Sequence, residues 1–382
     1  MLNCLRKALI GRNPPNPQRL DLCLTQKKLF ISYESKPIST CPVGSLTAHY
    51  LVSALGFTPE SALSVSRSVP SADPGKAAEV IGVFDQSGFS RAQITRIVMR
   101  FPRVLTLKPG RTIRPKIEFL RARGASEADV VNIICGCPWF LRRSLEGHIT
   151  PAFDMINRCL KSDSQTILSM RRCDNVSFWT VSAFVRNLNA LQAAGVHDNS
   201  IRFLLRNYPN CLWAYSRKFD RNLERVKSMG CDPLKVKFVL MLHVLMGLAQ
   251  STWEKKVSIF RRWGWSAEET LQAFMKAPNC MMISEVKLTA VMEFFVNEMG
   301  LEATYFASYP LIISYSLKNR IIPRCKAVEA LVSKKLIKPV PIISYITLPD
   351  ISFVEKFISP YSEEHPFVQK IYFEKLGKHS IA

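Results

Sequence analysis

Glycines recur at nearly constant intervals along this chain, and this periodicity constrains its fold more than any other feature. They stand at positions 88, 124, 195, 230, 264 and 300, so the intervals are 36, 71, 35, 34 and 36 residues, the second being about twice the others. A period near 35 residues is typical of a solenoid, in which each unit buries its apolar face only by stacking on its neighbours.

Prolines keep a fixed distance from these glycines. They lie fourteen residues after glycine at Pro102, Pro138, Pro209 and Pro278. Between the two markers, apolar residues follow the spacing of one helix face, as in Ile94, Ile97, Val98 and Phe101. Glycine suits the left-handed cap of the preceding helix, and proline ends the helix that follows. The unit at 159–194 lacks both markers, and Val244 stands where the Gly230 unit would have its proline.

A second helix is expected after each proline, as in R-K-F-D-R-N-L-E-R-V-K, residues 217–227. The pattern therefore predicts an all-α fold, a helical-repeat solenoid of about eight two-helix units with a short connector turn, over residues 46–355. Residues 356–382 form a C-terminal tail in this scheme. The run P-V-P-I-I-S-Y-I-T-L-P at 339–349 is ambiguous, but its prolines argue against a central strand.

Serines mark the expected starts of helices. Ser90 with Gln93 has the spacing of a capping box, and Ser126 with Asp129 has a looser version of it. The second helices have serines at their expected N-caps, namely Ser144, Ser216, Ser284 and Ser316.

The first 45 residues differ from the repeats. Arg6, Lys7, Arg12 and Arg19 precede the first acidic residue, Asp21. A basic, amphipathic and acid-poor start is typical of an organellar transit peptide without fixed structure, and a basic tail is the alternative. Its arginines and scarce serines favour the mitochondrion over the chloroplast.

The chain is strongly basic, with 52 Lys and Arg against 30 Asp and Glu, a net charge of +22. Such an excess indicates a polyanionic partner, most often nucleic acid. Basic residues recur 23 and 26 residues after the repeat glycines, and positions three apart share a helix face. These two columns predict the nucleic-acid-binding residues, which are Arg111, Arg114, Lys218, Arg221, Lys256, Lys287 and Lys326. The alternative is a basic helix face that only contacts solvent.

Patterns typical of catalysis are absent from the sequence. It has no phosphate-binding G-x-x-x-x-G-K-[ST], no G-x-S-x-G and no H-E-x-x-H. Its eleven cysteines are scattered without a C-x-x-C pair, which favours buried thiols in a reducing compartment over a metal site. The longest apolar run, 238–249, is too short to span a bilayer. We therefore expect no enzyme, no cofactor, no metal and no membrane partner, and a monomer.

The repeat motif resembles that of a known family. The segments F-P-R-V-L-T-L, R-P-K-I-E-F-L-R-A-R-G-A-S-E-A-D-V and N-Y-P-N-C-L-W-A are similar to the repeats of the mitochondrial transcription termination factor (mTERF) family, in particular its plant-type members. The resemblance covers most of residues 46–355. It implies an all-helical superhelix with a basic concave surface that binds double-stranded DNA or RNA, in organellar transcription, transcript processing or translation.

Two further hypotheses stand beside non-catalytic nucleic-acid binding in transcription termination or transcript processing. The first is a protein-binding adaptor, because helical repeats also serve that role and fold alone does not decide function. The second is an RNA-binding cofactor of intron splicing, which differs only in preferring RNA. Partners would include the organellar transcription or splicing machinery.

Overall fold

The computed structural model describes residues 46–375, except 70–73 and 174–179, and it divides into two compact units after Met246. The described residues form α-helices joined by short 3-10 and π turns, and no strand occurs among them, which confirms the all-α prediction. The ambiguous run at 339–349 contains a short helix. The predicted transit peptide, residues 1–45, lies outside the described residues.

The N-terminal unit, described over residues 46–246, contains the following helices. They are α2 (Leu46–Leu55), α3 (Pro59–Ser68), α4 (Pro74–Gln86), α5 (Arg91–Arg100), α6 (Arg114–Ala122), α7 (Glu127–Gly136), α8 (Thr150–Leu160), α9 (Asp163–Arg171), α10 (Val181–Ala193), α11 (Asp198–Asn207), α12 (Ser216–Ser228) and α13 (Val236–Gly247), whose last residue begins the next unit.

The C-terminal unit, described over residues 247–375, continues the same alternation. Its helices are α14 (Gln250–Arg262), α15 (Ala267–Lys276), α16 (Glu285–Glu293), α17 (Tyr305–Ser308), α18 (Leu311–Ser314), α19 (Ile322–Ser333), α20 (Ile342–Ile346), α21 (Asp350–Phe357) and α22 (Pro366–Lys375).

One repeat illustrates how the sequence produces the fold. The Ser90 hydroxyl accepts from the backbone of Gln93, whose side chain accepts from the Ser90 backbone, so the predicted capping box starts α5. Ile94, Ile97 and Val98 are fully buried along the predicted stripe. The helix ends at Arg100 with Phe101 as its C-cap, and a 3-10 turn, Pro102–Thr106, begins with the proline that cannot continue the helix. A π turn, Pro109–Ile113, then leads into α6.

The repeat glycines adopt the left-handed conformation that the sequence pattern requires. Their φ angles lie between 66° and 84° at positions 56, 88, 124, 195, 230, 264 and 300. Lys161 and Lys335 have φ angles of 55° and 58°, and they stand 37 residues after Gly124 and 35 residues after Gly300. The unit that lacks glycine in sequence therefore keeps the left-handed cap, with lysine in its place.

Three of the four predicted serine caps of the second helices are present. The hydroxyl oxygens of Ser144, Ser284 and Ser316 accept from backbone N–H groups three residues later. The prediction was wrong for Ser216, because α12 begins at this residue and its N-cap is Tyr215, which makes no side-chain cap. In the Gly230 unit, where Val244 replaces proline, α13 runs without a break to Gly247.

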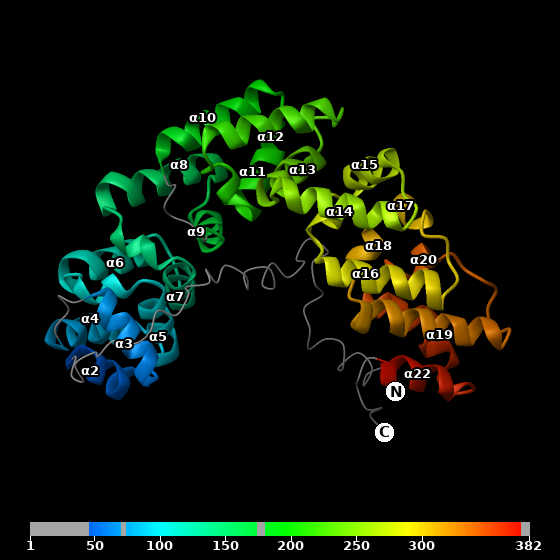
Figure 1. Ribbon diagram of the computed structural model, residues 1–382, viewed down its shortest axis with the longest axis horizontal. Helices are drawn as coiled ribbons and strands as arrows, with labels where there is room; N and C mark the ends of the chain where they lie inside the picture. The colour runs from blue at the N-terminus through cyan, green and yellow to red at the C-terminus, as the bar shows by residue number, and fades with distance from the viewer. Residues whose placement is uncertain (1–45, 70–73, 174–179, 376–382) are drawn as a thin grey trace, which may run out of the picture. The chain divides into compact units, whose positions relative to one another are not determined.

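Within the N-terminal unit the two helices of each repeat lie on different sides. Figure 1 shows α6, α8, α10 and α12, the second helices, along the outer edge of this unit, and α7, α9 and α11, the first helices, along its inner edge. The residues predicted to bind nucleic acid in this unit therefore belong to the outer helices or to the turns that start them.

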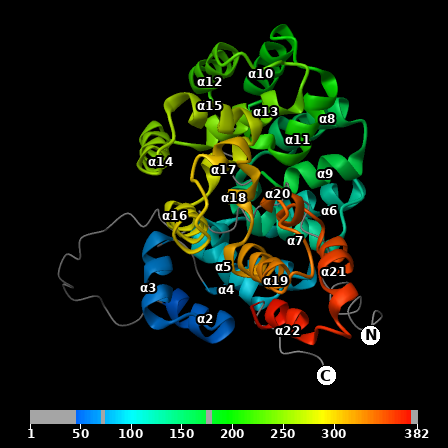
Figure 2. The ribbon, with the colours of Figure 1, turned by 90° about the vertical axis from the view of Figure 1, so that its right-hand side faces the viewer.

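In the C-terminal unit, helix packing continues beyond the expected repeats. Figure 2 shows α22 beside α19, which it contacts, with α21 close by. Val368 and Tyr372 of α22 are 0% and 2% exposed. The part of the expected C-terminal tail that the structure describes thus contains a packed helix, α22, which covers the apolar face of the last repeat as a capping element does.

Candidate nucleic-acid interface

Arg111 and Arg114 start the second helix of one repeat, and both are exposed. Arg111 lies in the π turn before α6, and its guanidinium bonds to no other described residue. Arg114 is the first residue of α6, and its guanidinium approaches the Gln86 side-chain oxygen at 3.4 Å, which is a long hydrogen bond. Both charges are therefore available to a ligand.

Lys218 and Arg221 lie in the first two turns of α12, where Arg221 is exposed and bonds to no other described residue. Lys218 differs, because its Nζ donates to the backbone oxygen of Met246 at 2.6 Å. The ammonium of Lys218 thus ties α12 to the end of α13.

The remaining three predicted residues are less accessible. Lys256 of α14 is 3% exposed, and its Nζ is buried without a hydrogen-bond partner among the described residues. Lys287 of α16 is half-buried and donates to the Ser314 oxygen at 2.7 Å. Lys326 of α19 pairs with Glu329 at 2.9 Å. Lys256 cannot reach a phosphate in this structure, since its whole side chain is enclosed.

Burial also changes how readily these lysines carry charge. It lowers the pKa of Lys287 and that of Lys256, where Glu285 and Cys280 oppose the shift. Arg111, Arg114 and Arg221 are therefore exposed with guanidinium groups that make at most one long hydrogen bond. Lys218 and Lys287 bond to backbone oxygens of the next repeat, Lys256 is enclosed, and Lys326 pairs with Glu329 on its own helix.

Comparison with known proteins decides the family. The mTERF family model matches residues 81–183 and 178–354, which is most of the chain. The chain belongs to the mTERF family. It is also 20% identical over 274 residues to "Transcription termination factor MTERF8, chloroplastic" of Arabidopsis thaliana, an alignment that covers 61% of this chain and 54% of that protein. The match thus spans about half the length of that curated relative, and the resemblance inferred from the repeat motifs is confirmed.

Several second helices of this chain have a buried polar residue on the face that packs inward, which the sequence analysis did not predict. These residues, here called the donor position, are Lys116, Asn187, Asn222, Lys256 and Arg324, and each is less than 9% exposed. Along the chain, successive members are separated by about one or two repeat periods.

Three of these side chains, those of Lys116, Asn187 and Arg324, bond to the backbone of the following repeat. Asn222 Nδ2 instead donates to the Lys218 oxygen of its own helix and to the Met246 sulfur, and Lys256 Nζ has no hydrogen-bond partner among the described residues. Lys116 Nζ donates to the Leu141 oxygen at 2.7 Å and to the Thr112 oxygen at 2.8 Å. Asn187 Nδ2 donates to the oxygens of Leu212 and Ala214 at 3.0 and 2.9 Å. The connectors have carbonyls that no regular helix bonds, so a buried donor from the previous repeat satisfies them.

Two repeats place the donor one turn earlier in the helix. Lys218 precedes Asn222 by four residues and bonds to the Met246 oxygen. In α16 the donor position is occupied by the apolar residue Val291. Lys287, four residues earlier, donates through its Nζ to the Ser314 backbone oxygen. A signal for these residues was present in the sequence, because Lys116 interrupts the apolar stripe of Ile113, Ile117 and Leu120.

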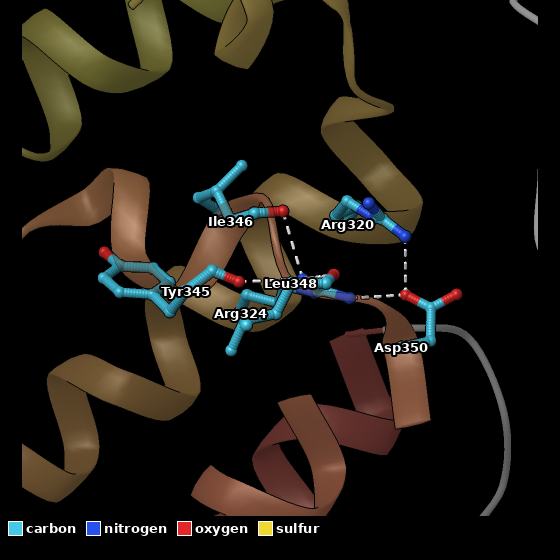
Figure 3. Close-up of polar contacts among 6 residues, drawn as sticks. All are labelled: Arg320, Arg324, Tyr345, Ile346, Leu348 and Asp350. Carbon is cyan, nitrogen blue, oxygen red and sulfur yellow. Dashed lines mark hydrogen bonds and ion pairs between the residues drawn. The ribbon is translucent and has the colours of Figure 1, made fainter. Parts of the chain in front are cut away.

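Arg324 is the most extensively bonded of the donors (Figure 3). One of its terminal nitrogens donates to the oxygens of Tyr345, Ile346 and Leu348 at 2.8, 3.1 and 2.7 Å. The other donates to the Asp350 carboxylate, which also accepts from Arg320 at 2.9 Å. Arg324 is 0% exposed, so these contacts compensate for burying a guanidinium.

The described residues contain no group of three or more His, Cys, Asp or Glu side chains that could hold a metal ion. No single helix in the described part of the chain is long and apolar enough to cross a membrane; the pair Val236–Gly247 and Gln250–Arg262 would pass together by length and composition alone.

Proposed function

We propose that this mTERF protein binds double-stranded nucleic acid, DNA or RNA, and regulates organellar gene expression without catalysis. The observation that carries the proposal is the set of exposed arginines Arg111, Arg114 and Arg221 at the starts of α6 and α12. The net charge of +22 supports it. So does the similarity to a protein named as a chloroplastic transcription termination factor.

The proposed mechanism is occupancy. Arginine guanidinium groups neutralise backbone phosphates, and the bound protein then blocks or positions the transcription or transcript-processing machinery. Phosphate contacts fix position on the duplex but carry no sequence information, so the target sequence depends on other groups. The buried side chains of Lys116, Asn187 and Arg324 tie neighbouring repeats together through hydrogen bonds.

The proposed setting is an organelle, to which the basic and acid-poor residues 1–45 would direct the chain. Composition favours the mitochondrion, whereas the name of the Arabidopsis relative favours the chloroplast. A fluorescent fusion of the full chain in plant cells, beside one that lacks residues 1–45, tests both. The full chain should enter one organelle and the shortened chain should not.

The binding test is fluorescence anisotropy of the full chain on duplex DNA, duplex RNA and single-stranded RNA of one sequence across a range of salt concentrations. Replacing Arg111, Arg114 and Arg221 with alanine should lower the slope of log affinity against log salt on duplex DNA. The expected decrease is about 0.9 for each phosphate that the variant no longer neutralises. The ligand bound most tightly distinguishes a DNA role from an RNA role, including splicing.

The matched control removes the same charge from the first helices of the same unit and their connector. Arg96, Arg103 and Arg206 are outside the predicted set, and their alanine variant should keep the wild-type slope. A reduced slope in this variant alone would place the contacts on the first helices instead. Failure of the wild-type chain to bind any of the three ligands at low salt would favour a protein-binding adaptor.

A further inference from the structure

The C-terminal unit contains a hollow of about 500 Å³ between α14 and the start of α16. The residues that line it are Lys255, Ser258, Ile259, Arg261, Arg262 and Glu285. Lys255, Ser258 and Arg262 are spaced by three and four residues, so they share one face of α14. Three of the six lining residues are cations and one is an anion, which leaves the hollow with a positive charge.

The cations of the hollow have no hydrogen-bond or ion-pair partners among the described residues. The side chains of Lys255, Arg261 and Arg262 are exposed, and none makes a hydrogen bond or an ion pair with another described residue. Other basic residues of this unit, such as Lys287, Arg320 and Arg324, bond to carbonyls or carboxylates of the protein. These residues stabilise the fold through their bonds, whereas the cations of the hollow make no such bond in the described part of the chain.

Two further features increase the positive potential at this place. The hollow reaches the N-terminus of α16, where backbone N–H groups and the helix dipole favour an anion. Lys256, the neighbour of Lys255 in α14, has a buried Nζ with no hydrogen-bond partner among the described residues, and it interacts electrostatically with Glu285. Glu285 is in turn bonded to none of the cations around it in the described structure.

We propose that this hollow binds a backbone phosphate of the nucleic acid, as a contact separate from Arg111, Arg114 and Arg221. Lys255, Arg261 and Arg262 would supply the charge, and Glu285 would weaken the contact by repulsion. The proposal rests on the proposed nucleic-acid binding and adds a contact in the C-terminal unit, at residues that the repeat columns do not contain.

The test compares two variants of the full chain by anisotropy on duplex DNA and duplex RNA. In one, Lys255, Arg261 and Arg262 become alanine. In the other, the exposed residues Lys276, Lys334 and Lys338 become alanine, which removes the same charge from the same unit. The hollow variant should lower the salt slope on duplex DNA by about 0.9 for each phosphate released from the hollow, and the control variant should leave the slope unchanged.

Glu285→Gln should change the affinity for nucleic acid in the opposite direction to the alanine variant of the hollow. An increase in affinity could not result from unfolding of the variant. Removal of one exposed like charge should raise affinity about two- to fivefold. Thermal unfolding of each variant, followed by circular dichroism, verifies that the helical fold persists.

The outcomes separate this proposal from the one it rests on. If wild-type chain binds nucleic acid and the hollow and control variants have equal slopes, the hollow is no phosphate contact while nucleic-acid binding stands. If wild-type chain binds no nucleic acid, both proposals fail. If calorimetry with inorganic phosphate shows binding that the hollow variant loses, while both variants keep the wild-type slope, the ligand is a free phosphate and the backbone contact is overturned.

Discussion

Lys116 of α6 donates through its Nζ to the backbone oxygen of Leu141, 25 residues later, at 2.7 Å. The two residues belong to successive repeats, so the bond fastens one second helix to the connector of the next unit. Lys116 is 4% exposed, and burial lowers its pKa to about 8. Burial therefore makes the protonated form of Lys116 less stable than it would be in water.

The lowered pKa of Lys116 predicts that the free energy of unfolding changes with pH in the alkaline range. The pKa of Lys116 is about 8 when folded and about 10.4 when unfolded, so above pH 8 the unfolded chain retains a proton that the folded chain has lost. Stability relative to Lys116→Met should therefore rise between pH 8 and 10.4, by up to about 3 kcal/mol. Below pH 8 the difference should be constant. Urea unfolding of both proteins at pH 7.5 and pH 10 measures it.

An exposed lysine provides the control for this experiment. Lys108→Met removes one exposed lysine from the turn before α6, and its unfolding free energy is measured at the same two pH values for comparison. A constant difference in unfolding free energy between wild type and Lys116→Met across the range would mean that Lys116 keeps an ordinary pKa.

Local periodicity predicted most of the fold. Glycine at positive φ, serine caps and the i, i+3, i+4 stripe of α5 are determined by a few neighbouring residues, so the sequence displays them directly. Lys161 is an exception. Its left-handed conformation is imposed by the packed repeats around it and cannot be predicted from the local preference of lysine, which disfavours that conformation.

The candidate site was less predictable for a physical reason. A lysine or arginine at a given repeat position either contacts solvent or bonds to the next repeat. Which of the two occurs depends on whether a backbone carbonyl more than 20 residues later in the chain lies within hydrogen-bonding distance. Lys218 and Lys287 bond to such carbonyls, whereas Arg221 remains exposed. The repeat pattern did not predict Lys255, Arg261 and Arg262, because they do not stand 23 or 26 residues after a repeat glycine.

Lys161→Gly should stabilise the protein. A non-glycine residue at positive φ costs about 1–2 kcal/mol, and the greater freedom of glycine in the unfolded chain cancels part of that gain, so we expect about 0.5–1 kcal/mol. The reverse change, Gly124→Ala, should destabilise by about 1 kcal/mol. A Cβ at Gly124 would meet nothing within 4 Å, so only its φ of 83° is tested. Chemical denaturation that ranks the two variants in the opposite order would contradict the conformational explanation.

Lys256→Met should also stabilise the protein. The Nζ of Lys256 is buried without a hydrogen-bond partner among the described residues, and a buried unsatisfied polar group costs about 1–3 kcal/mol. Methionine has a similar length and no polar hydrogen, so it should recover that amount. Lys255→Met, at the exposed neighbouring position, should change stability by less than about 0.5 kcal/mol. Equal unfolding midpoints for wild type and Lys256→Met would show that the amine is satisfied in solution.

Arg324→Met should be the most destabilising of these substitutions, costing about 3–5 kcal/mol. It removes the donor from three carbonyls and from Asp350, and it also takes away a guanidinium that lies 4.6 Å from the Phe353 ring centre. Arg320→Met removes one bond to the same carboxylate, which is 42% exposed, and should cost only about 1 kcal/mol. Urea denaturation of Arg324→Met, Arg320→Met, Asp350→Asn and the Arg324→Met/Asp350→Asn double variant measures these costs and the coupling between Arg324 and Asp350. If Arg324→Met costs no more than Arg320→Met, the bonds to the 345–348 carbonyls contribute nothing net. If it costs several times more, the donor position is what fastens α20 and α21 to α19.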